Sequence, residues 1–266
     1  SYSLTNPLEV VEGFAPRYQI AVALDPNSTG GSRWIHENLG SGSIIEISHP
    51  KNNFPLNETA KHSLLLAGGI GITPIWSMVQ RLAQLKRSWR LVYCARDQGR
   101  ATFFDELRKH PEVTFNFDHT PGGTVLDIAK LVASSPDDAH LYCCGPNSML
   151  ASFRDATATF EANKIHLEYF KGSSESATGG FTLILAKSGL EIQVPPGVSI
   201  LDAVLARGVE VAYTCTEGVC GSCETTVIEG EPEHKDLILS AAEKANGSTM
   251  MICCSGSRSS KLVLDL

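Results

Sequence analysis

The chain has 266 residues, which is more than one typical domain contains, so we expect two or three domains. Its 42% hydrophobic and 19% charged residues predict a folded globular protein, and a formal charge of −7 disfavours a nucleic-acid partner. No run of about 18 apolar residues and no basic stretch leading into an apolar one occurs. We therefore expect no membrane span, no signal peptide and a cytoplasmic monomer.

Residues 1–57 are rich in β-forming patterns. Two β-branched runs bounded by Pro, Asn and Gly, at Tyr18–Leu24 and Ser43–Ser48, predict short strands. The sequence has no initiator Met and opens in a strand-like stretch, so we expect that a segment preceding residue 1 is missing.

A glycine pair lies between these two runs. Gly30, Gly31 and Ser32 precede a two-turn helical pattern over Arg33–Leu39, with Ser32 as the expected N-cap. The glycines leave backbone N–H groups free to face an anion, which suits a phosphate. A plain capped turn explains the same residues equally well.

Residues 58–172 alternate between strand and helix patterns. The expected strands are Leu64–Ala67, Leu91–Ala95, Val113–Phe117, His140–Cys144 and Ile165–Phe170. The expected helices are Pro74–Lys86, Phe103–Lys109, Leu126–Val132 and Asn147–Phe160. This rhythm predicts a parallel sheet with helices on both faces, in which ligands bind beyond the carboxyl ends of the strands.

Two turns follow strands at that edge. In Gly68–Pro74 the glycines permit close approach of a pyrophosphate, with Thr73 as the expected cap and Pro74 as the first helical residue. Because Pro74 takes the last position, the ordinary G-x-G-x-x-G fingerprint does not apply. The second turn is Cys144–Pro146. Arg96 follows the second strand, where a phosphate contact and a solvated charge are even alternatives.

The last third of the chain follows a small, polar stretch typical of a linker, which we place at 173–180. Residues 181–266 then show a hairpin, a helix capped by Ser199 and further short strands, which together predict a small α+β unit.

The most specific signal in the chain is its cysteine spacing. Cys215, Cys220 and Cys223 form a C-x4-C-x2-C run, and Cys253 follows at a distance. This is the plant-type pattern for a [2Fe–2S] cluster, in which two irons are each completed by two thiolates. A zinc site usually has two short Cys pairs and a disulfide framework suits short secreted chains, so both are weaker alternatives.

These features together resemble the phthalate dioxygenase reductase family, the flavin-dependent reductases of Rieske-type oxygenase systems. The resemblance covers the whole chain in order and rests on five features: Tyr2–Leu4, Gly30–Ser32, Gly68–Pro74, Cys144–Pro146 and the four cysteines. It implies three domains. We place the C-terminal part of an antiparallel flavin β-barrel at 1–57, an α/β parallel-sheet nicotinamide domain at 58–172, and an α+β β-grasp ferredoxin domain at 181–266.

The resemblance also implies roles for single residues. Ser3, near the reactive flavin nitrogen, and Cys144, beside the nicotinamide, are the expected catalytic residues. The expected FMN contacts are Tyr2, Ser3, Leu4, Gly30, Gly31, Ser32 and Phe170. The expected NADH contacts are Gly69, Gly71, Thr73, Arg96, Cys144 and Gly145. The family's flavin-binding Arg falls before residue 1, and Thr29 stands where members often have another Arg.

The implied activity is transfer of electrons from NADH through FMN to the [2Fe–2S] cluster and on to a Rieske-type terminal oxygenase. The aromatic substrate site is expected on that partner. Two readings of other classes stay open from the sequence: a ferredoxin-type carrier or flavin-less fragment without NADH activity, and a zinc-stabilised adaptor.

Overall fold

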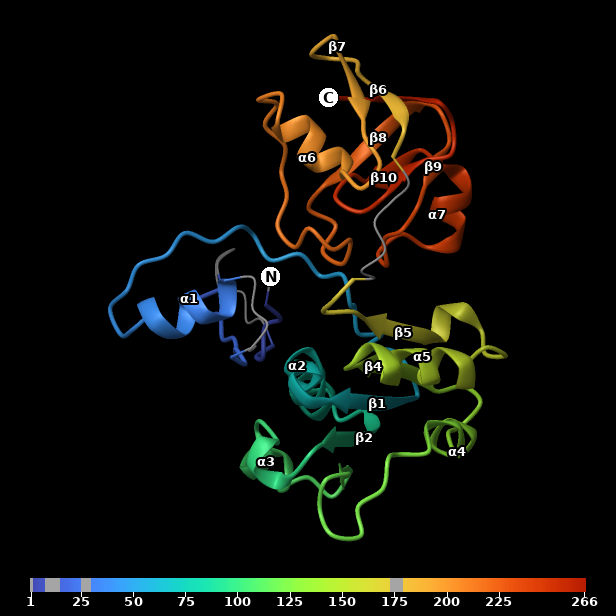
Figure 1. Ribbon diagram of the computed structural model, residues 1–266. Helices are drawn as coiled ribbons and strands as arrows, with labels where there is room; N and C mark the ends of the chain where they lie inside the picture. The colour runs from blue at the N-terminus through green and yellow to red at the C-terminus, as the bar shows by residue number, and fades with distance from the viewer. Residues whose placement is uncertain (1, 8–14, 25–29, 173–178) are drawn as a thin grey trace. The chain divides into compact units, whose positions relative to one another are not determined.

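The computed structural model describes residues 2–7, 15–24, 30–172 and 179–266. The described chain forms two compact units, one from Tyr2 to Glu168 and the other from Tyr169 to Leu266 (Figure 1). Each unit has its own sheet and its own apolar core. Among the described residues, no helix is long and apolar enough to cross a membrane.

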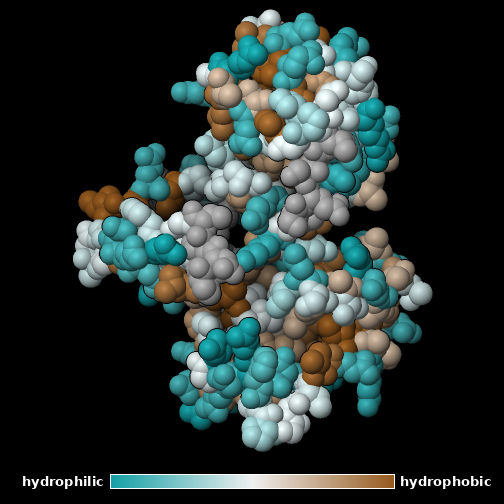
Figure 2. All heavy atoms as spheres, viewed as in Figure 1, coloured by the Kyte–Doolittle hydropathy of each residue, from teal (hydrophilic) through white to brown (hydrophobic). Residues whose placement is uncertain are grey.

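The first part of the first unit contains one helix, α1 (Gly31–Asn38), and little regular β-structure. Leu4 and Ile20 form an isolated antiparallel bridge. The expected strands at Tyr18–Leu24 and Ser43–Ser48 are otherwise wrong, because no described strand pairs with either run. Three isoleucines in the second run are exposed, and Figure 2 shows apolar side chains at the surface of the segment that follows α1.

A five-stranded parallel sheet forms the rest of this unit, with the order β3-β2-β1-β4-β5. Its strands are β1 (His62–Gly68), β2 (Ser88–Ala95), β3 (Val113–Phe117), β4 (His140–Cys144) and β5 (Ile165–Glu168). The chain winds outward in one direction through β2 and β3 and in the other through β4 and β5. The winding reverses between β1 and β4, and open α/β sheets bind ligands beyond the carboxyl ends of strands at such a point.

Helices separate these strands, as expected. They are α2 (Ile72–Gln84), α3 (Phe104–Leu107), α4 (Ile128–Ala133) and α5 (Asn147–Ala156), together with short 3-10 turns η1 (Gly69–Gly71), η2 (Gln98–Arg100) and η3 (Ala162–Lys164). The expectation that Thr73 caps α2 is wrong, because the helix begins at Ile72 with Gly71 as N-cap. Ile75, Val79 and Leu82 of α2 are fully buried in the core of this unit.

The second unit contains a mixed five-stranded sheet with the order β10-β8-β12-β6-β7. The strands of this sheet are β6 (Phe181–Leu185), β7 (Leu190–Val194), β8 (Glu224–Glu229), β10 (Thr249–Met251) and β12 (Lys261–Leu264). A separate short pair joins β9 (Pro232–Glu233) to β11 (Gly256–Ser257). The two helices are α6 (Ile200–Leu205) and α7 (Ala241–Asn246).

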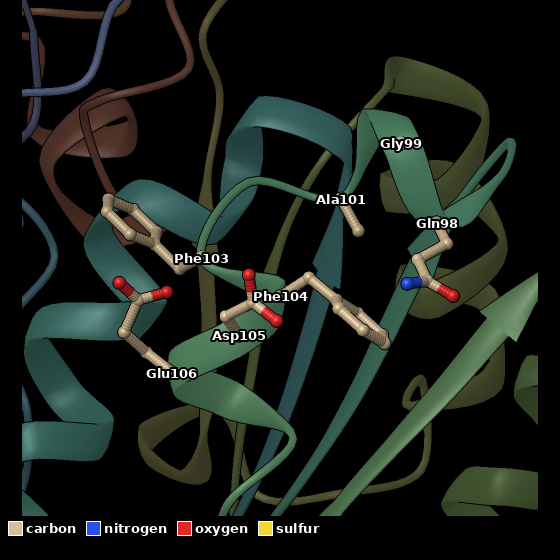
Figure 3. A pocket seen from close by; sticks show the side chains of 7 residues that line it. All are labelled: Gln98, Gly99, Ala101, Phe103, Phe104, Asp105 and Glu106. Carbon is tan, nitrogen blue, oxygen red and sulfur yellow. The ribbon is translucent and has the colours of Figure 1, made fainter.

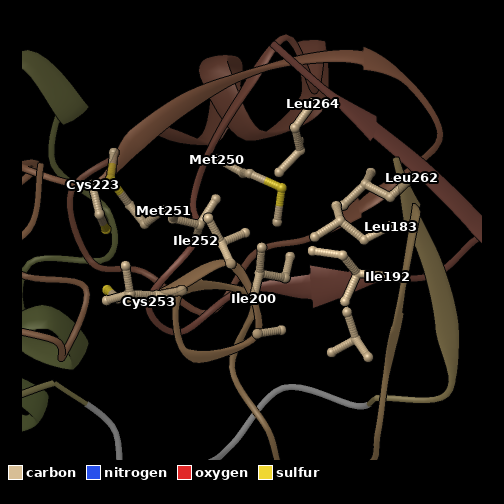
Figure 4. Packing of buried hydrophobic residues seen from close by; sticks show 14 of the residues in the cluster. Leu183, Ile192, Ile200, Cys223, Met250, Met251, Ile252, Cys253, Leu262 and Leu264 are labelled. Carbon is tan, nitrogen blue, oxygen red and sulfur yellow. The ribbon is translucent and has the colours of Figure 1, made fainter. Parts of the chain in front are cut away.

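The core of the second unit lies between α6 and the sheet. Its buried side chains include Leu183, Ile192, Ile200, Met250 and Leu262. Figure 4 shows that Cys223 and Cys253 lie together at one end of this packed cluster. The hydrophobic effect that closes the core therefore also fixes the backbone that carries these two sulfurs.

Candidate functional site

The four expected ligand cysteines converge in the second unit. Cys220, Cys223 and Cys253 are buried and Cys215 is partly exposed. The Cys253 thiol is in hydrogen-bonding contact with the thiols of Cys215 and Cys223, although Cys253 is far from both in the sequence. These contacts lower the pKa of Cys215 to about 4 and also lower the pKa of Cys223, while they raise the pKa of Cys253. The lowered pKa values of Cys215 and Cys223 favour thiolates, the form of cysteine that binds iron.

The short loop between Cys215 and Cys223 turns through left-handed backbone. Gly218 has φ of +70° and Gly221 has φ of +73°, which L side chains adopt rarely. This backbone turns N–H groups toward sulfur: the amide of Glu217 donates to Cys215 Sγ at 3.4 Å. Such hydrogen bonds help to set the reduction potential of an iron–sulfur cluster. The donor set and the glycine turns therefore fit a [2Fe–2S] cluster.

The C-x4-C-x2-C run with a distant fourth cysteine has the spacing of a plant-type binuclear centre. Among the described residues, no group of three or more His, Cys, Asp or Glu side chains is arranged around one metal ion. A [2Fe–2S] cluster distributes its four thiolates over two irons and spaces them more widely. Cys254, the neighbour of the fourth ligand, is also in contact with the Cys253 thiol, and its sulfur packs against Gly218, where an added Cβ would lie 2.4 Å from it.

In the first unit, the two predicted turns meet at the carboxyl ends of β1 and β4. A Cβ added to Gly71 would lie 2.3 Å from the carbonyl oxygen of Cys144, and one added to Gly145 would lie 3.1 Å from Gly68. The Tyr93 hydroxyl donates to Gly69 O at 3.1 Å, and the Thr73 hydroxyl donates to Ile70 O at 2.9 Å. Only glycine allows this close backbone packing.

A carboxyl group that the sequence analysis missed lies at the same edge. The Cys144 thiol donates to Glu168 Oε2 at 3.9 Å, and the side chain of Ser3 also hydrogen-bonds Glu168. Burial raises the pKa of Glu168 to about 7 and holds the pKa of the Cys144 thiol well above its usual value. The structure thus joins both expected catalytic residues, Ser3 and Cys144, through one carboxyl group. Glu168 was missed because its role depends on its pairing with Cys144, and the expected strand ran on to Phe170.

The glycine pair and Tyr2 form a second small cluster. The Tyr2 hydroxyl lies 3.3 Å from where a Cβ of Gly31 would be, at the start of α1. The N-cap of α1 is Gly30, so the expectation that Ser32 caps this helix is wrong: with φ of 124°, the glycine lets the helix begin earlier. Ser32 is buried in the first turn. Thr29 lies outside the described residues.

Arg96 and Phe170 are both at the surface, where the structure assigns them no ligand. Arg96 is exposed just beyond β2, and its carbonyl accepts a hydrogen bond from His119 N at 3.0 Å. Phe170 is 37% exposed. The expectation that Phe170 ends the last strand is wrong, because β5 stops at Glu168.

An open hollow of about 430 Å³ lies beyond β2 and was not predicted (Figure 3). The side chains of Phe103 and Phe104 are held by other aromatic rings: Phe103 stacks on Trp76 at 5.9 Å and Phe104 packs on Phe115 at 4.7 Å between ring centroids. Asp105 and Glu106 complete its lining in this stretch. Two carboxylates disfavour a phosphate group here.

Known proteins resemble both units. A family model described as an oxidoreductase NAD-binding domain matches residues 65–155, and one described as a 2Fe-2S iron-sulfur cluster binding domain matches residues 183–257. The phenoxybenzoate dioxygenase subunit beta of Ectopseudomonas oleovorans is 48% identical over the whole chain and 82% of its own length. The phthalate dioxygenase reductase of Burkholderia cepacia is 38% identical over the whole chain and 83% of its own length.

Two solved structures match along the whole chain. A phthalate dioxygenase reductase structure shares 37% identity with a TM-score of 0.68 and is covered over 83% of its length. An intact type IV self-sufficient cytochrome P450 monooxygenase shares 34% identity with a TM-score of 0.85, over 35% of its chain. The chain belongs to the phthalate dioxygenase reductase family.

Membership in this family identifies the chain as an NADH-dependent flavin and iron–sulfur oxidoreductase, the reductase component of an oxygenase system. Its cofactors are a [2Fe–2S] cluster, FMN and NADH. The expected fold class is confirmed: flavin barrel, parallel-sheet nicotinamide domain and ferredoxin domain.

Proposed function

We propose that this chain delivers electrons from NADH to a Rieske-type terminal oxygenase, with Cys215, Cys220, Cys223 and Cys253 as the ligands of its [2Fe–2S] cluster. The observation that carries the assignment is the contact of the Cys253 thiol with Cys215 and Cys223 at one end of the ferredoxin core. When bound, the cofactors supply hydride acceptance and the change from two-electron to one-electron transfer.

Residues of the first unit position NADH and FMN. Gly69, Gly71 and Thr73 shape the turn that receives the pyrophosphate, and Cys144 and Gly145 border the nicotinamide. Ser3, through Glu168, holds the hydrogen-bonded edge at which hydride transfer takes place. At the α1 end, Gly30, Gly31 and Ser32 offer the first turn of the helix to the FMN phosphate, with the Tyr2 hydroxyl beside Gly31.

The adenosine end of NADH is assigned to the hollow beyond β2, and exposed Arg96, which directly follows β2, remains a proposed NADH contact. Asp97 accepts a hydrogen bond from Arg100 N at 3.1 Å. In this proposal its carboxylate lies near the ribose, where NADPH would carry a 2′-phosphate. This charge favours NADH, since the extra phosphate would be repelled. Leu4 and Phe170 remain proposed flavin contacts.

We assign residues 1–57 to the flavin barrel, 58–172 to the NAD-binding domain, 173–180 to the linker and 181–266 to the ferredoxin domain. The chain acts as a cytoplasmic monomer in this proposal, because reduced thiols are needed before a cluster is built.

The oxygenase docks where the cluster loop reaches the surface. Tyr213 at the start of the loop is 48% exposed, and Cys215 is partly exposed. The exposed carboxylates of Glu210 and Glu224 flank the loop, so a basic partner surface fits best. Direct contact of the oxygenase with this face keeps the distance for electron transfer from the cluster to the oxygenase short.

The first test is the visible absorption spectrum of the purified protein before and after anaerobic NADH. Overlapping flavin and iron–sulfur bands that bleach with NADH support the proposal. Cluster bands unmoved by NADH overturn the NADH and flavin roles, and a colourless protein overturns the ligand assignment.

The nature of the partner is tested by adding a purified Rieske oxygenase or a haem-containing P450 domain to the NADH-reduced protein. We expect rapid bleaching of the Rieske spectrum and slow reduction of the haem. The P450 alternative arises from the structural match to the self-sufficient monooxygenase. Faster electron delivery to haem than to the Rieske centre would overturn the partner assignment.

A further inference from the structure

A short strap in the second unit joins the two parts of the proposed ligand set. This strap, residues 234–239, runs between β9 and α7. The amide of Leu237 donates to Gly218 O in the cysteine loop at 3.0 Å. The amide of Lys235 donates to Ser255 Oγ at 3.2 Å, two residues beyond Cys253. The strap therefore holds the three-cysteine loop and the fourth-ligand segment at once.

At the centre of the strap lies a fully buried carboxylate. Asp236 has a side-chain exposure of 0%, and its Oδ2 accepts hydrogen bonds from the amides of Ile238 at 3.2 Å and Leu239 at 2.8 Å. Lys244 Nζ lies 3.6 Å from the same oxygen and donates to the Asp236 main-chain carbonyl. Two backbone amides and a lysine therefore surround the Asp236 carboxylate.

The other oxygen of Asp236 is unusual. Asp236 Oδ1 faces His234 Nδ1 at 3.6 Å, and the His234 side chain is only 8% exposed. Among the described residues, the buried side-chain N and O atoms without a hydrogen-bond partner are Asp236 Oδ1, both ring nitrogens of His234, and Ser63 Oγ. Burying unsatisfied polar atoms costs stability, so their concentration in one place calls for a functional reason.

Asp236 packs directly on the cysteine loop. A Cβ added to Gly218 would lie 3.1 Å from the Cα and 3.3 Å from the Cβ of Asp236. Gly218 stands two residues before the ligand Cys220. The carboxylate thus lies behind the loop, away from water, where a charge acts on its neighbours through a low dielectric.

We propose that buried Asp236, together with its partner Lys244, sets the reduction potential of the cluster. Reduction adds one negative charge beside the loop. The Asp236 carboxylate opposes that charge and Lys244, 31% exposed, partly offsets the carboxylate. The pair thereby determines how readily the cluster accepts electrons from the flavin. This inference rests on the ligand assignment of the proposed function.

The test is spectroelectrochemical titration of the cluster in the full-length Asp236→Asn and Lys244→Met proteins. Asp236→Asn keeps the shape of the side chain and removes its negative charge. The midpoint potential of the cluster should therefore become more positive by at least 59 mV, which is a tenfold change in the one-electron reduction equilibrium. Lys244→Met leaves the carboxylate uncompensated, so its potential should become more negative. A purely structural role of the strap would not produce shifts of opposite sign.

A matched pair of exposed charges in the same unit serves as control. Asp265 and Lys187 form an ion pair at 2.9 Å with side chains 41% and 68% exposed, so Asp265→Asn and Lys187→Met should leave the potential unchanged. The electron paramagnetic resonance spectrum of the reduced cluster reports whether the ligands are intact in each variant.

Shifts of the same sign in both strap variants, or potentials equal to those of the controls, would overturn the inference. If Asp236→Asn does not retain its cluster, the Lys244→Met potential decides alone: a negative shift supports the inference and an unchanged potential refutes it. Absence of a [2Fe–2S] spectrum in the unmodified protein would refute the ligand assignment itself, and the two failures are thus distinguishable.

Discussion

Cys144 and Glu168 lie directly opposite each other on the neighbouring parallel strands β4 and β5, and the Cys144 thiol donates to the Glu168 carboxyl group at 3.9 Å. Both residues end their strands at the carboxyl edge of the sheet, where the Cys144 backbone packs against Gly71. Burial makes the carboxyl group a weak acid with a pKa of about 7, so its charge changes within the working range of the enzyme.

Glu168→Gln should remove a pH dependence from hydride transfer. In the parent protein we expect the rate of flavin reduction by NADH to change with an apparent pKa near the value of about 7. Stopped-flow measurements from pH 5.5 to about 8.5 should show this change in the parent and a flat profile in the variant. An unaltered profile in Glu168→Gln would show that another group titrates.

The same substitution should alter stability in a defined pH window. Because the folded pKa of Glu168 is about 7 and its ordinary value is 4.5, the folded state holds the proton more tightly than the unfolded state. The protonated carboxyl group makes its full contribution to the free energy of unfolding below pH 4.5. This contribution, roughly 3 kcal/mol, is lost as pH rises through about 7. Glu168→Gln should therefore gain stability relative to the parent between these pH values, as measured by urea unfolding.

Replacement of adjacent cysteines should give opposite results. Cys253→Ser removes a proposed ligand, so the iron–sulfur absorbance and the iron content should fall close to zero. Cys254→Ser changes a sulfur that packs on Gly218, so the cluster should be retained with a small change in stability. Equal cluster loss in both variants would mean that the fourth ligand is assigned to the wrong neighbour.

Tyr2→Phe should weaken FMN binding. The Tyr2 hydroxyl lies beside Gly31, where the phosphate is proposed to bind, and a hydrogen bond to a charged group contributes about 1.5–3 kcal/mol. We expect at least about a tenfold rise in the dissociation constant, measured by fluorescence of released FMN. Tyr18 and Tyr2 are both 40% exposed, so Tyr18→Phe is a matched control that should bind FMN normally.

Gly71→Ala should disrupt the nicotinamide turn. The added methyl group would lie 2.3 Å from the Cys144 carbonyl oxygen and 2.8 Å from Gly145 N, both backbone atoms. We expect a loss of about 3 kcal/mol or more in unfolding free energy and a large rise in KM for NADH. Gly40→Ala meets no atom within 4 Å and should behave like the parent in thermal unfolding and in NADH kinetics. Normal NADH kinetics in Gly71→Ala would contradict the proposed role of the turn.

Local patterns predicted those parts of the fold that depend on local hydrophobicity. Strands Val113–Phe117 and His140–Cys144 occur with the bounds expected. His140–Cys144 is largely buried, as its short apolar run indicates, and the edge strand Val113–Phe117 alternates apolar and polar residues. Tyr18–Leu24 and Ser43–Ser48 carry the same kind of run but do not form regular strands. A β-strand needs a neighbouring strand to pair with as well as residues of high β-propensity. The sequence of one apolar run does not show whether such a neighbour exists.

Helix starts were predicted less well than helix existence. Ser32 and Thr73 are the residue types that cap helices, yet Gly30 and Gly71 take the N-cap positions of α1 and α2. By contrast, Ser240 and Glu243 form a capping box at α7 that the sequence displayed and that we overlooked. Glu168 was missed because its role depends on its cross-strand neighbour, which only the sheet order supplies.

The eight cysteines fall into two chemical populations. Burial raises the pKa of the Cys94 thiol to about 12 and raises the pKa values of Cys143 and Cys144 further, so these sheet thiols are poor nucleophiles. In the ferredoxin unit, Cys215 and Cys223 have lowered pKa values and lie in contact with Cys253. Loss of the cluster would thus release readily oxidised thiols at disulfide-forming range. Air exposure of the iron-free protein should therefore cross-link this loop and prevent reassembly of the cluster.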